Sequence, residues 1–168
     1  MDARHYTAMA TLRDGSAVLV RAQRPDDRAG LEQALGRMDD ESIQMRFFAP
    51  KRYFSDTELS FFLDIDFVQQ VALVAELDGV IAGGCRYIAT QPGRAEVAFA
   101  VADDCQGRGL GRVLLEHLAG IARAQGLQQL FAEVLPDNTP MLAVFRKSGL
   151  QTVTRHEAGV VHVTLDLT

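Results

Sequence analysis

The chain has 168 residues, of which 48% are hydrophobic and 23% are charged, and its formal net charge is −5 at pH 7. This length and composition are typical of one globular domain with a hydrophobic core, and they exclude a disordered chain. The acidic balance argues against a general nucleic-acid binder, which normally shows a basic face, and it allows a cationic amine as a partner.

The sequence shows no targeting or membrane-spanning segment. No apolar run approaches the ~20 residues that a membrane span needs, and Met1 opens no secretory signal with a charged and then an apolar part. Cys85 and Cys105 are the two cysteines, a number typical of reduced thiols in the cytoplasm. We therefore expect a cytoplasmic protein without a nucleic-acid or membrane partner.

The N-terminal part of the chain predicts a strand followed by a helix. Residues 1–15 are polar and irregular, and we expect them to form an unpaired tail before a domain that occupies residues 16–168. Residues 16–21 predict the first strand. Pro25 then opens a helix whose apolar residues recur at helical spacing.

A second helical part with many aromatic residues follows. Residues 41–48 predict a short helical or irregular piece, and a capping box at residues 55–58 opens a further helix. The aromatic side chains either form the core under a helical hairpin, which is the more common arrangement, or line a groove for a substrate. They are Phe47, Phe48, Tyr53, Phe54, Phe61 and Phe62.

The middle of the chain predicts three antiparallel strands. Residues 71–77 and 80–88 flank Asp78-Gly79, a pair that favours a tight hairpin. Gly83-Gly84 in the second strand predicts a bulge or a close backbone approach. After another turn, the alternation of residues 96–101 predicts the third strand.

The C-terminal part predicts a helix, a strand, a short helix and a final hairpin. The long helix is expected over residues 109–125 and the strand over residues 129–135. Asn138 or Thr139 caps the short helix, and residues 152–167 form the hairpin. The whole order indicates an α/β (α+β) domain with a mostly antiparallel central sheet of six to seven strands and about four flanking helices.

A glycine-rich turn connects the strand at residues 96–101 to the long helix. Backbone N–H groups at glycine, together with those of the first helical turn, can approach a phosphate closely and carry partial positive charge. A turn that binds nothing needs one glycine, whereas this one has a glycine at every second position, so we predict a phosphate cradle. The candidate phosphate-binding residues are Gln106, Gly107, Arg108, Gly109, Leu110, Gly111 and Arg112, with Arg108 favoured over Arg112 because it lies inside the turn.

Two common phosphate motifs do not fit this turn. A P-loop needs a Lys-Ser/Thr pair after its last glycine, and a dinucleotide fingerprint needs glycine where Arg112 stands. The pattern Gln106-x-x-Gly109-x-Gly111 resembles the signature loop of the GNAT superfamily of N-acetyltransferases, in which the loop holds the pyrophosphate of acetyl-CoA or another acyl-CoA. The order of the predicted elements is similar to that of the family over residues 17–167.

Three blocks resemble one branch of the superfamily more narrowly. Residues 41–48, 95–101 and 133–138 are similar to the acetyltransferase domain of bacterial Pat-type protein lysine acetyltransferases. Many of those enzymes carry a second domain, for which we expect no room in this chain. The resemblance therefore implies acetyl transfer to a primary amine and leaves open whether that amine is a protein lysine or a small molecule.

Acetyl transfer to an amine needs a group that removes a proton from the amine. Deprotonating a lysine with a pKa near 10.4 costs roughly 4–5 kcal/mol at neutral pH, and a nearby carboxylate can act as the general base. Glu96 is the candidate, because it shares a strand face with the small residues Ala98 and Ala100 and matches the glutamate base of the Pat-type domains. Alternatively, Glu96 is an ordinary charge at a solvated strand end, and Glu133 is the second candidate base.

The resemblance also implies where the rest of acetyl-CoA lies. Its pantetheine arm is expected to run along the backbone of Phe99 and Val101 as an added strand. Asn138 bonds the pantetheine or only caps its helix. In many members of the family a tyrosine protonates the leaving sulfur, but Phe145 stands at that position here. We expect Phe145 to contact the cofactor without donating a proton. The proton is then expected to come from solvent or from the amine.

Three functions follow from these residues. The leading one is an acetyl-CoA-dependent N-acetyltransferase that acts by direct transfer, with a protein lysine as the expected acceptor. The second is an acetyltransferase for a small-molecule amine, and the third is a non-catalytic CoA-binding sensor. The four histidines form no metal-ligand spacing and neither cysteine has a histidine at a telling distance, so we expect no metal and no acyl-cysteine route.

Overall fold

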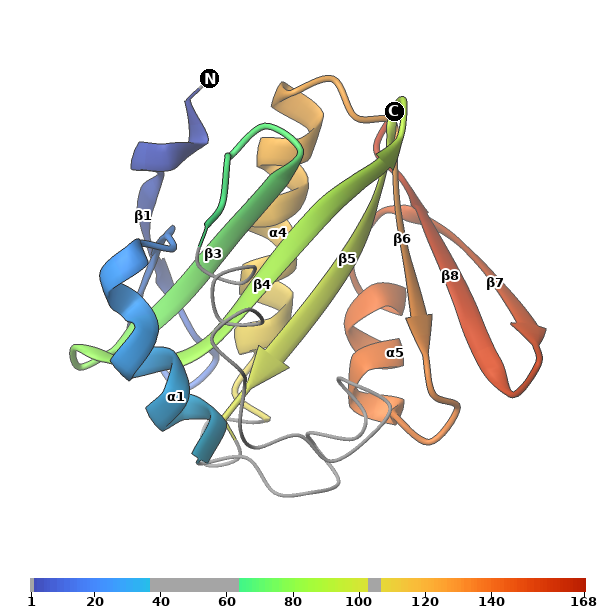
Figure 1. Cartoon of the computed structure of the whole chain (residues 1–168). Helices are drawn as coiled ribbons and strands as arrows, with labels where there is room; N and C mark the ends of the chain where they lie inside the picture. The colour runs from blue at the N-terminus through green and yellow to red at the C-terminus, as the bar shows by residue number, and fades with distance from the viewer. Residues whose placement is uncertain (1, 37–63, 103–106) are drawn as a thin grey trace.

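The computed structural model describes residues 2–36, 64–102 and 107–168. Its centre is one sheet of eight strands in the order β1-β2-β3-β4-β5-β6-β8-β7 (Figure 1). Neighbouring strands are antiparallel except β5 and β6, which are parallel. The α/β class with a mostly antiparallel sheet is confirmed, and the sheet has eight strands where six to seven were expected.

The elements follow one another in nearly the predicted order. The predictions for residues 41–48, for the helix opened at 55–58 and for the aromatic cluster lie outside the described residues, as do Cys105 and Gln106. With η for a 3-10 helix, the elements are η1 (Ala3–His5), β1 (Thr7–Thr11), β2 (Ala17–Ala22), η2 (Pro25–Asp27), α1 (Arg28–Gly36), β3 (Gln70–Leu77), β4 (Val80–Gln91), β5 (Arg94–Val101), α4 (Leu110–Ala124), β6 (Gln129–Val134), α5 (Thr139–Arg146), β7 (Gln151–Glu157) and β8 (Val160–Asp166).

The N-terminal residues contradict the expectation of an unpaired tail. Strand β1 forms one edge of the sheet and pairs antiparallel with β2, from Thr7 opposite Arg21 to Thr11 opposite Ala17. Its side chains are alternately exposed and half-buried, because an edge strand covers little of the core. Threonine and alanine at these positions give little hydrophobic alternation, so the sequence pattern missed the strand.

Helices α4 and α1 lie on opposite faces of the sheet (Figure 1). The buried face of α4 includes Leu114, Leu118 and Ile121, each at most 1% exposed, and burial of such a side chain stabilises the fold by about 1.5–3 kcal/mol. On the other face, Ala34 of α1 packs against Val74 and Ile81. The two helices thus cover β3 and β4 from both sides of the sheet.

A buried ion-pair network ties the entry of α1 to the sheet. The Arg21 guanidinium, on β2, donates to Asp27 Oδ1 at 2.8 Å and to Oδ2 at 2.9 Å, and its Nε donates to Glu76 at 3.1 Å. Asp27 also accepts from the backbone N–H of Arg24 at 2.7 Å. Burial by itself raises the pKa of the Asp27 carboxyl, but the bonds from Arg21 and Arg24 lower it overall.

Strands β5 and β6 separate after a short parallel contact, and this opens the sheet. They pair only from Arg94 opposite Gln129 to Glu96 opposite Phe131. Beyond this point β5 continues beside β4 alone while β6 continues beside β8, and Figure 1 shows the two strands diverging toward α5. Gly83-Gly84 predicted a bulge or a close backbone approach, and both occur at Gly83. The β3–β4 register shifts next to Gly83, which pairs with Ala75 while Ile81 pairs with Glu76. A Cβ atom on Gly83 would lie 2.7 Å from the Ala100 carbonyl oxygen of β5.

Candidate active site

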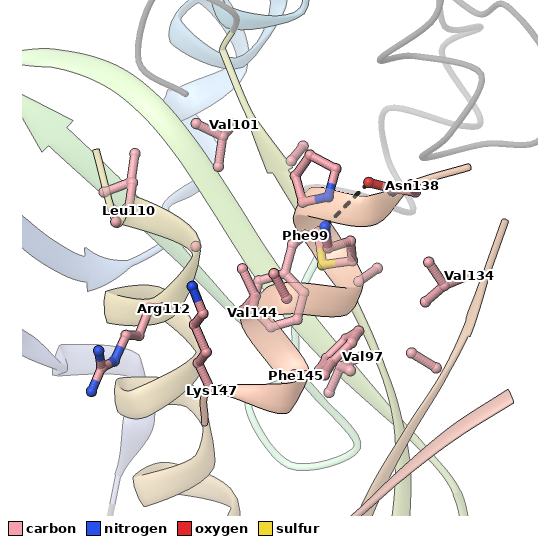
Figure 2. Close-up of a pocket in the computed structure, with 18 of the residues that line it drawn as sticks. Val97, Phe99, Val101, Leu110, Arg112, Val134, Asn138, Val144, Phe145 and Lys147 are labelled. Carbon is pink, nitrogen blue, oxygen red and sulfur yellow. Dashed lines mark hydrogen bonds between the residues drawn. The ribbon is translucent and has the colours of Figure 1, made fainter. Parts of the chain in front are cut away.

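A cleft of about 430 Å³ lies where β5 and β6 have separated. Its walls come from β5, the glycine turn, the start of α4, the end of β6 and α5, and Figure 2 shows side chains of these elements converging on it. The apolar part includes Phe99 and Phe145, whose rings pack edge to face with centroids 5.9 Å apart. Phe145 is 1% exposed and carries no hydroxyl group, so it is a packing residue of the cleft wall.

The three glycines of the turn serve two different purposes. Gly107 and Gly109 have φ values of 78° and 88°, in the left-handed region that a residue with a Cβ atom adopts only with strain. Gly111 has an ordinary backbone, but a Cβ atom there would lie 3.2 Å from Cγ2 of Val144 on α5. The first two glycines therefore shape the turn, and the third brings α5 close to α4.

The start of α4 presents backbone donors to the cleft. Leu110 is 2% exposed and anchors the first turn of the helix in the core. The N–H group of Val113 bonds the Gly109 carbonyl at 3.2 Å, whereas the N–H groups one to three residues earlier have no acceptor inside the helix. Since Gly109, Leu110, Gly111 and Arg112 all line the cleft, these donors and the positive end of the helix dipole are available to an anion.

The cleft passes through the sheet and separates charges of opposite sign. Val97 and Phe99 of β5 are buried on the side of α4 and α5, so the alternating side chain of Glu96 lies on the opposite face. The pairing of Glu96 with Phe131 places Glu133 on that face too. Among the described residues, the cations that line the cleft come from the α4 and α5 side or from the β1–β2 turn, and they are Arg13, Arg112 and Lys147.

The two carboxylates of the cleft differ in their partners. Glu133 Oε1 lies 3.7 Å from Nδ1 of His162 on β8. Glu96 is exposed and makes no ion pair within residues 2–36, 64–102 and 107–168. Beside Glu96, the small side chains of Ala98 and Ala100 also line the cleft, as expected from the strand pattern. With respect to the described residues, Glu96 is therefore the carboxylate whose two oxygens face a ligand without an ion-pair partner.

The two arginines of the turn lie in different surroundings. The Nε atom of Arg108 donates to Asp14 Oδ2 at 2.9 Å, and one of its terminal nitrogens donates to Ser16 Oγ at 2.8 Å. The hydrogen bonds from Ser16, reinforced by Arg108, lower the pKa of the Asp14 carboxyl to about 2. Arg112 lines the cleft and pairs with Glu116 at 3.3 Å. The order of preference expected from the sequence, Arg108 before Arg112, thus differs from the geometry.

Two cations of the cleft had no signal in the sequence. Arg13 lies on the β1–β2 turn, and Lys147 follows the last residue of α5, from which it points toward the start of α4 in Figure 2. Neither belongs to the glycine motif, and only the folding of the chain brings them to it. A basic residue at the end of a helix is common for electrostatic reasons alone, so Lys147 could not be selected from its position.

Asn138 has the capping role and also faces the cleft. Its Oδ1 accepts a hydrogen bond from the Met141 N–H at 3.2 Å, drawn as the dashed line in Figure 2, which confirms it as the cap of α5. Its side chain lines the cleft, and its amide NH₂ group has no partner within the part of the chain that the structure describes. The amide nitrogen can thus donate to a ligand while the oxygen caps the helix.

Cys85 is not placed for covalent chemistry. It is 5% exposed, its Sγ lies 3.8 Å from the Leu114 carbonyl oxygen, and burial raises the pKa of its thiol. A neutral, buried thiol is a poor nucleophile.

His117 has a structural contact. Its Nδ1 atom shares a hydrogen bond with the Tyr6 hydroxyl, which connects η1 and β1 to α4.

Neither a metal site nor a membrane helix is present in the described ranges. No group of three or more His, Cys, Asp or Glu residues among them lies together as metal ligands would. Within the same ranges no helix has both the length and the apolar character to cross a membrane.

Comparisons with known proteins give a consistent result. A model of the acetyltransferase (GNAT) family matches residues 41–150. The chain is 36% identical over 127 residues to Acetyltransferase PA5475 of Pseudomonas aeruginosa, an alignment that covers 73% of this chain and 68% of that protein. It is 42% identical over 73 residues to Acetyltransferase Pat of Mycolicibacterium smegmatis, covering 44% of this chain and 22% of that protein.

Solved structures with the same fold were also found. The GNAT domain of S. lividans PAT superposes with a TM-score of 0.89 at 38% identity, over 95% of this chain and 96% of that chain. An acetyltransferase-like structure from Salmonella typhimurium, solved with acetyl-CoA, has a TM-score of 0.75 at 18% identity, over 90% and 94% of the two chains, and so shares the fold. The residues that the family model matches include β5, α4, β6 and α5, which build the cleft.

Proposed function

Because the chain belongs to the acetyltransferase (GNAT) family, we propose that this acetyltransferase moves an acetyl group from acetyl-CoA to a primary amine, with a protein lysine as the acceptor. The observation that carries the proposal is the cleft through the sheet, with cations on one side and carboxylates on the other. Acetyl-CoA is strongly anionic and a lysine side chain is cationic, so each substrate has a complementary side from which to enter.

The residues of the cleft fit the phosphates of acetyl-CoA. The backbone N–H groups of the turn and of the first residues of α4 are proposed to hold the pyrophosphate, and a side chain at any of the three glycines would add strain or steric contact. The charge of Arg112 supports this contact. Gln106 belongs to the same proposal on the strength of the sequence motif alone.

The edge of β5 fits the pantetheine arm. Beyond Glu96, β5 pairs with no further residue of β6. The backbone from Val97 to Phe99 can therefore bind an extended chain as another strand would. Phe99 and Val101 line this part of the cleft, and the amide NH₂ of Asn138 lies on its wall. Phe145 supplies an apolar surface next to Phe99.

Glu96 is proposed as the general base. When bound, acetyl-CoA supplies an activated acetyl group whose thioester bond breaks as the new amide bond forms. Glu96 takes a proton from the ammonium group of the acceptor, directly or through water, and the neutral amine then attacks the acetyl carbonyl. Since Phe145 cannot donate a proton, the leaving sulfur takes one from solvent or from the amine.

The proposed acceptor, a lysine of another protein, rests on two observations. Glu96 is exposed, and the Glu133 side chain is 51% exposed, so a side chain that projects from another protein can reach both. The second observation is the similarity to Acetyltransferase Pat and to the GNAT domain of S. lividans PAT. A small-molecule amine remains the alternative acceptor.

The experiment incubates the protein with radiolabelled acetyl-CoA and a bacterial lysate that is split into macromolecules and small molecules. We expect label on lysine side chains of proteins, located by mass spectrometry, and at least about 10²-fold slower labelling with a Glu96→Gln control. Label confined to the small-molecule fraction would show that the acceptor is a small-molecule amine and not a protein lysine. The absence of label in both fractions, despite tight binding of acetyl-CoA, would indicate the non-catalytic sensor.

A further inference from the structure

Hydrogen bonds of Arg108 connect the turn between β1 and β2 to the glycine turn of the cleft. Arg108 bonds both Asp14 and Ser16, which lie more than ninety residues earlier in the chain. Asp14 Oδ1 also accepts the backbone N–H of Ser16 at 2.9 Å, so one carboxylate joins the backbone of the β1–β2 turn to the arginine. We call Asp14, Ser16 and Arg108 the turn clamp.

The turn clamp holds Arg13 at the cleft. The side chain of Arg13 lies over Gly109, where a Cβ atom would be 3.3 Å from its Nε and 3.5 Å from its Cγ. Arg13 lines the cleft together with Gly107 and Arg112, whereas Arg108 does not. The residue that the turn clamp presents to the cleft is therefore Arg13.

Arg13 also differs from the neighbouring arginines in its charge partners among the described residues. Arg108 is paired with Asp14 and Arg112 with Glu116, whereas Arg13 makes no ion pair with any residue in the described ranges. A guanidinium has five N–H donors in a planar fork that matches two oxygens of a phosphate. The full charge and the donors of Arg13 are thus available beside the free N–H groups of α4.

We propose that Arg13 is a phosphate-binding residue of the cleft and that Arg108 is a positioning residue, which acts through Asp14 and Ser16 to hold Arg13 in place. This inference rests on the proposed use of acetyl-CoA. That molecule offers two phosphate sources, the pyrophosphate and the 3′-phosphate, which share the chemistry that Arg13 recognises.

The test measures dissociation constants by calorimetry for acetyl-CoA and for 3′-dephospho-acetyl-CoA. A charge-assisted hydrogen bond contributes about 1.5–3 kcal/mol, so R13Q is expected to weaken acetyl-CoA binding by about tenfold or more. If the weakening persists with the 3′-dephospho compound, Arg13 binds the pyrophosphate, and if it disappears, Arg13 binds the 3′-phosphate. R155Q, which changes an exposed arginine outside the cleft, is expected to bind like the wild type.

The positioning role of Arg108 is tested by a double-mutant cycle. R108Q should weaken acetyl-CoA binding, and the R13Q/R108Q protein should bind no more weakly than R13Q, because Arg108 acts only through Arg13. The same cycle is measured with Asp14→Asn in place of R108Q if R108Q does not fold. Asparagine keeps an oxygen acceptor for the Ser16 N–H but removes the carboxylate that Arg108 bonds. Thermal unfolding checks that each variant is folded.

Three results separate the possible failures. An R13Q protein whose dissociation constant stays within about twofold of the wild type overturns the role of Arg13. Additive effects of R13Q and R108Q overturn the positioning role of Arg108 and leave Arg13 as a phosphate contact by itself. A wild-type protein that binds no acetyl-CoA overturns the proposed function from which both assignments start.

Discussion

Glu96 and Glu133 are chemically identical side chains on one face of the opened sheet, yet their surroundings differ. His162 lies beside Glu133 at 3.7 Å, while Glu96 has no ion pair among the described residues and lies next to two alanines. A general base needs an oxygen that faces the incoming amine without competition from a neighbouring side chain of the protein. This comparison favours Glu96 as the base and leaves Glu133 to attract the cationic acceptor.

Replacing Glu96 with glutamine should therefore affect the chemical step more than binding. We expect kcat at neutral pH to fall by about 10²- to 10⁴-fold, which is the usual contribution of a general base. The dissociation constant of acetyl-CoA should stay the same, because Glu96 lies on the opposite face of the sheet from α4 and the glycine turn. Initial rates and calorimetry measure the two quantities separately.

The matched control is Glu157→Gln, which removes an exposed carboxylate on β7, outside the cleft. This variant should retain both the rate of acetyl transfer and the affinity for acetyl-CoA.

As pH rises, the rate of the Glu96→Gln protein should approach that of the wild type, because the acceptor amine then loses its proton without a general base. A Glu96→Gln protein with normal turnover at neutral pH would exclude Glu96 as the base.

At the level of elements, the cleft depends on how the turn enters α4. Gly109 has a φ of 88°, and a side chain there would meet Arg13. Gly109→Val forces a β-branched residue into a left-handed conformation, which costs roughly 1–2 kcal/mol, and it displaces the N–H groups that face the cleft. We expect the variant to fold and to lose acetyl-CoA binding, as measured by calorimetry and thermal unfolding.

Gly120 provides the control, because it lies within α4, it is exposed, and a Cβ atom there would meet nothing within 4 Å. Gly120→Ala should bind acetyl-CoA normally and be more stable by up to about 1 kcal/mol, since alanine favours the helix. Wild-type affinity in Gly109→Val would show that the turn does not hold the cofactor.

The junction of β2 and α1 depends on the Arg21 network. Arg21 and Asp27 are 5% and 7% exposed, and removal of one partner of a buried ion pair leaves an uncompensated charge that costs about 3–5 kcal/mol. We expect Arg21→Met to lower the free energy of unfolding by that amount in urea titrations. The control is Arg155→Met, which breaks the exposed pair with Glu157. This variant should change the free energy of unfolding by at most about 1 kcal/mol. Equal, small losses in both variants would contradict the structural role of Arg21.

At the scale of the whole molecule, carboxyl groups whose pKa is lowered in the folded state contribute to how stability responds to acid, and Asp27 and Asp66 are two of them among the described residues. Burial raises the pKa of Asp66, but hydrogen bonds from the N–H groups of Gln70, Val68 and Gln69 lower it overall from 3.8. A carboxyl whose pKa is lower in the folded state stabilises that state above its unfolded pKa, and this stabilisation is lost as pH falls through the folded pKa.

The melting temperature should therefore change little between about pH 7 and pH 5 and fall below about pH 4. Asp66→Asn keeps an oxygen for the N–H groups but no longer titrates, so its melting temperature should fall less steeply in the same range. Thermal scans at several pH values measure both curves. Parallel curves for the wild type and Asp66→Asn would show that Asp66 does not contribute.

The parts of the fold that were predicted from the sequence have local causes. The β3–β4 hairpin followed from Asp78-Gly79, whose φ values of 53° and 78° are those that this pair favours. Helix α4 followed from its apolar spacing and from Gly126, and α5 followed from its cap at Asn138. In each case a few neighbouring residues specify the backbone, so no tertiary information was needed.

The parts that were missed depend on contacts between distant segments. Strand β1 is specified by pairing with β2 and by the Tyr6–His117 contact, and neither is visible as a hydrophobic pattern. Arg108 was expected at a phosphate because of its place in the glycine motif, and no local pattern indicated that it bonds a carboxylate 94 residues away. Arg13 reaches the cleft for the same reason, and no motif in its own segment marks it.

The most direct test of the account is a crystal structure of the protein with CoA bound. We expect the pyrophosphate against the backbone N–H groups between Gly107 and Arg112, the pantetheine arm along the open edge of β5, and the sulfur facing the side of the sheet that carries Glu96. A pyrophosphate bound elsewhere, or a sulfur directed away from Glu96, would contradict it.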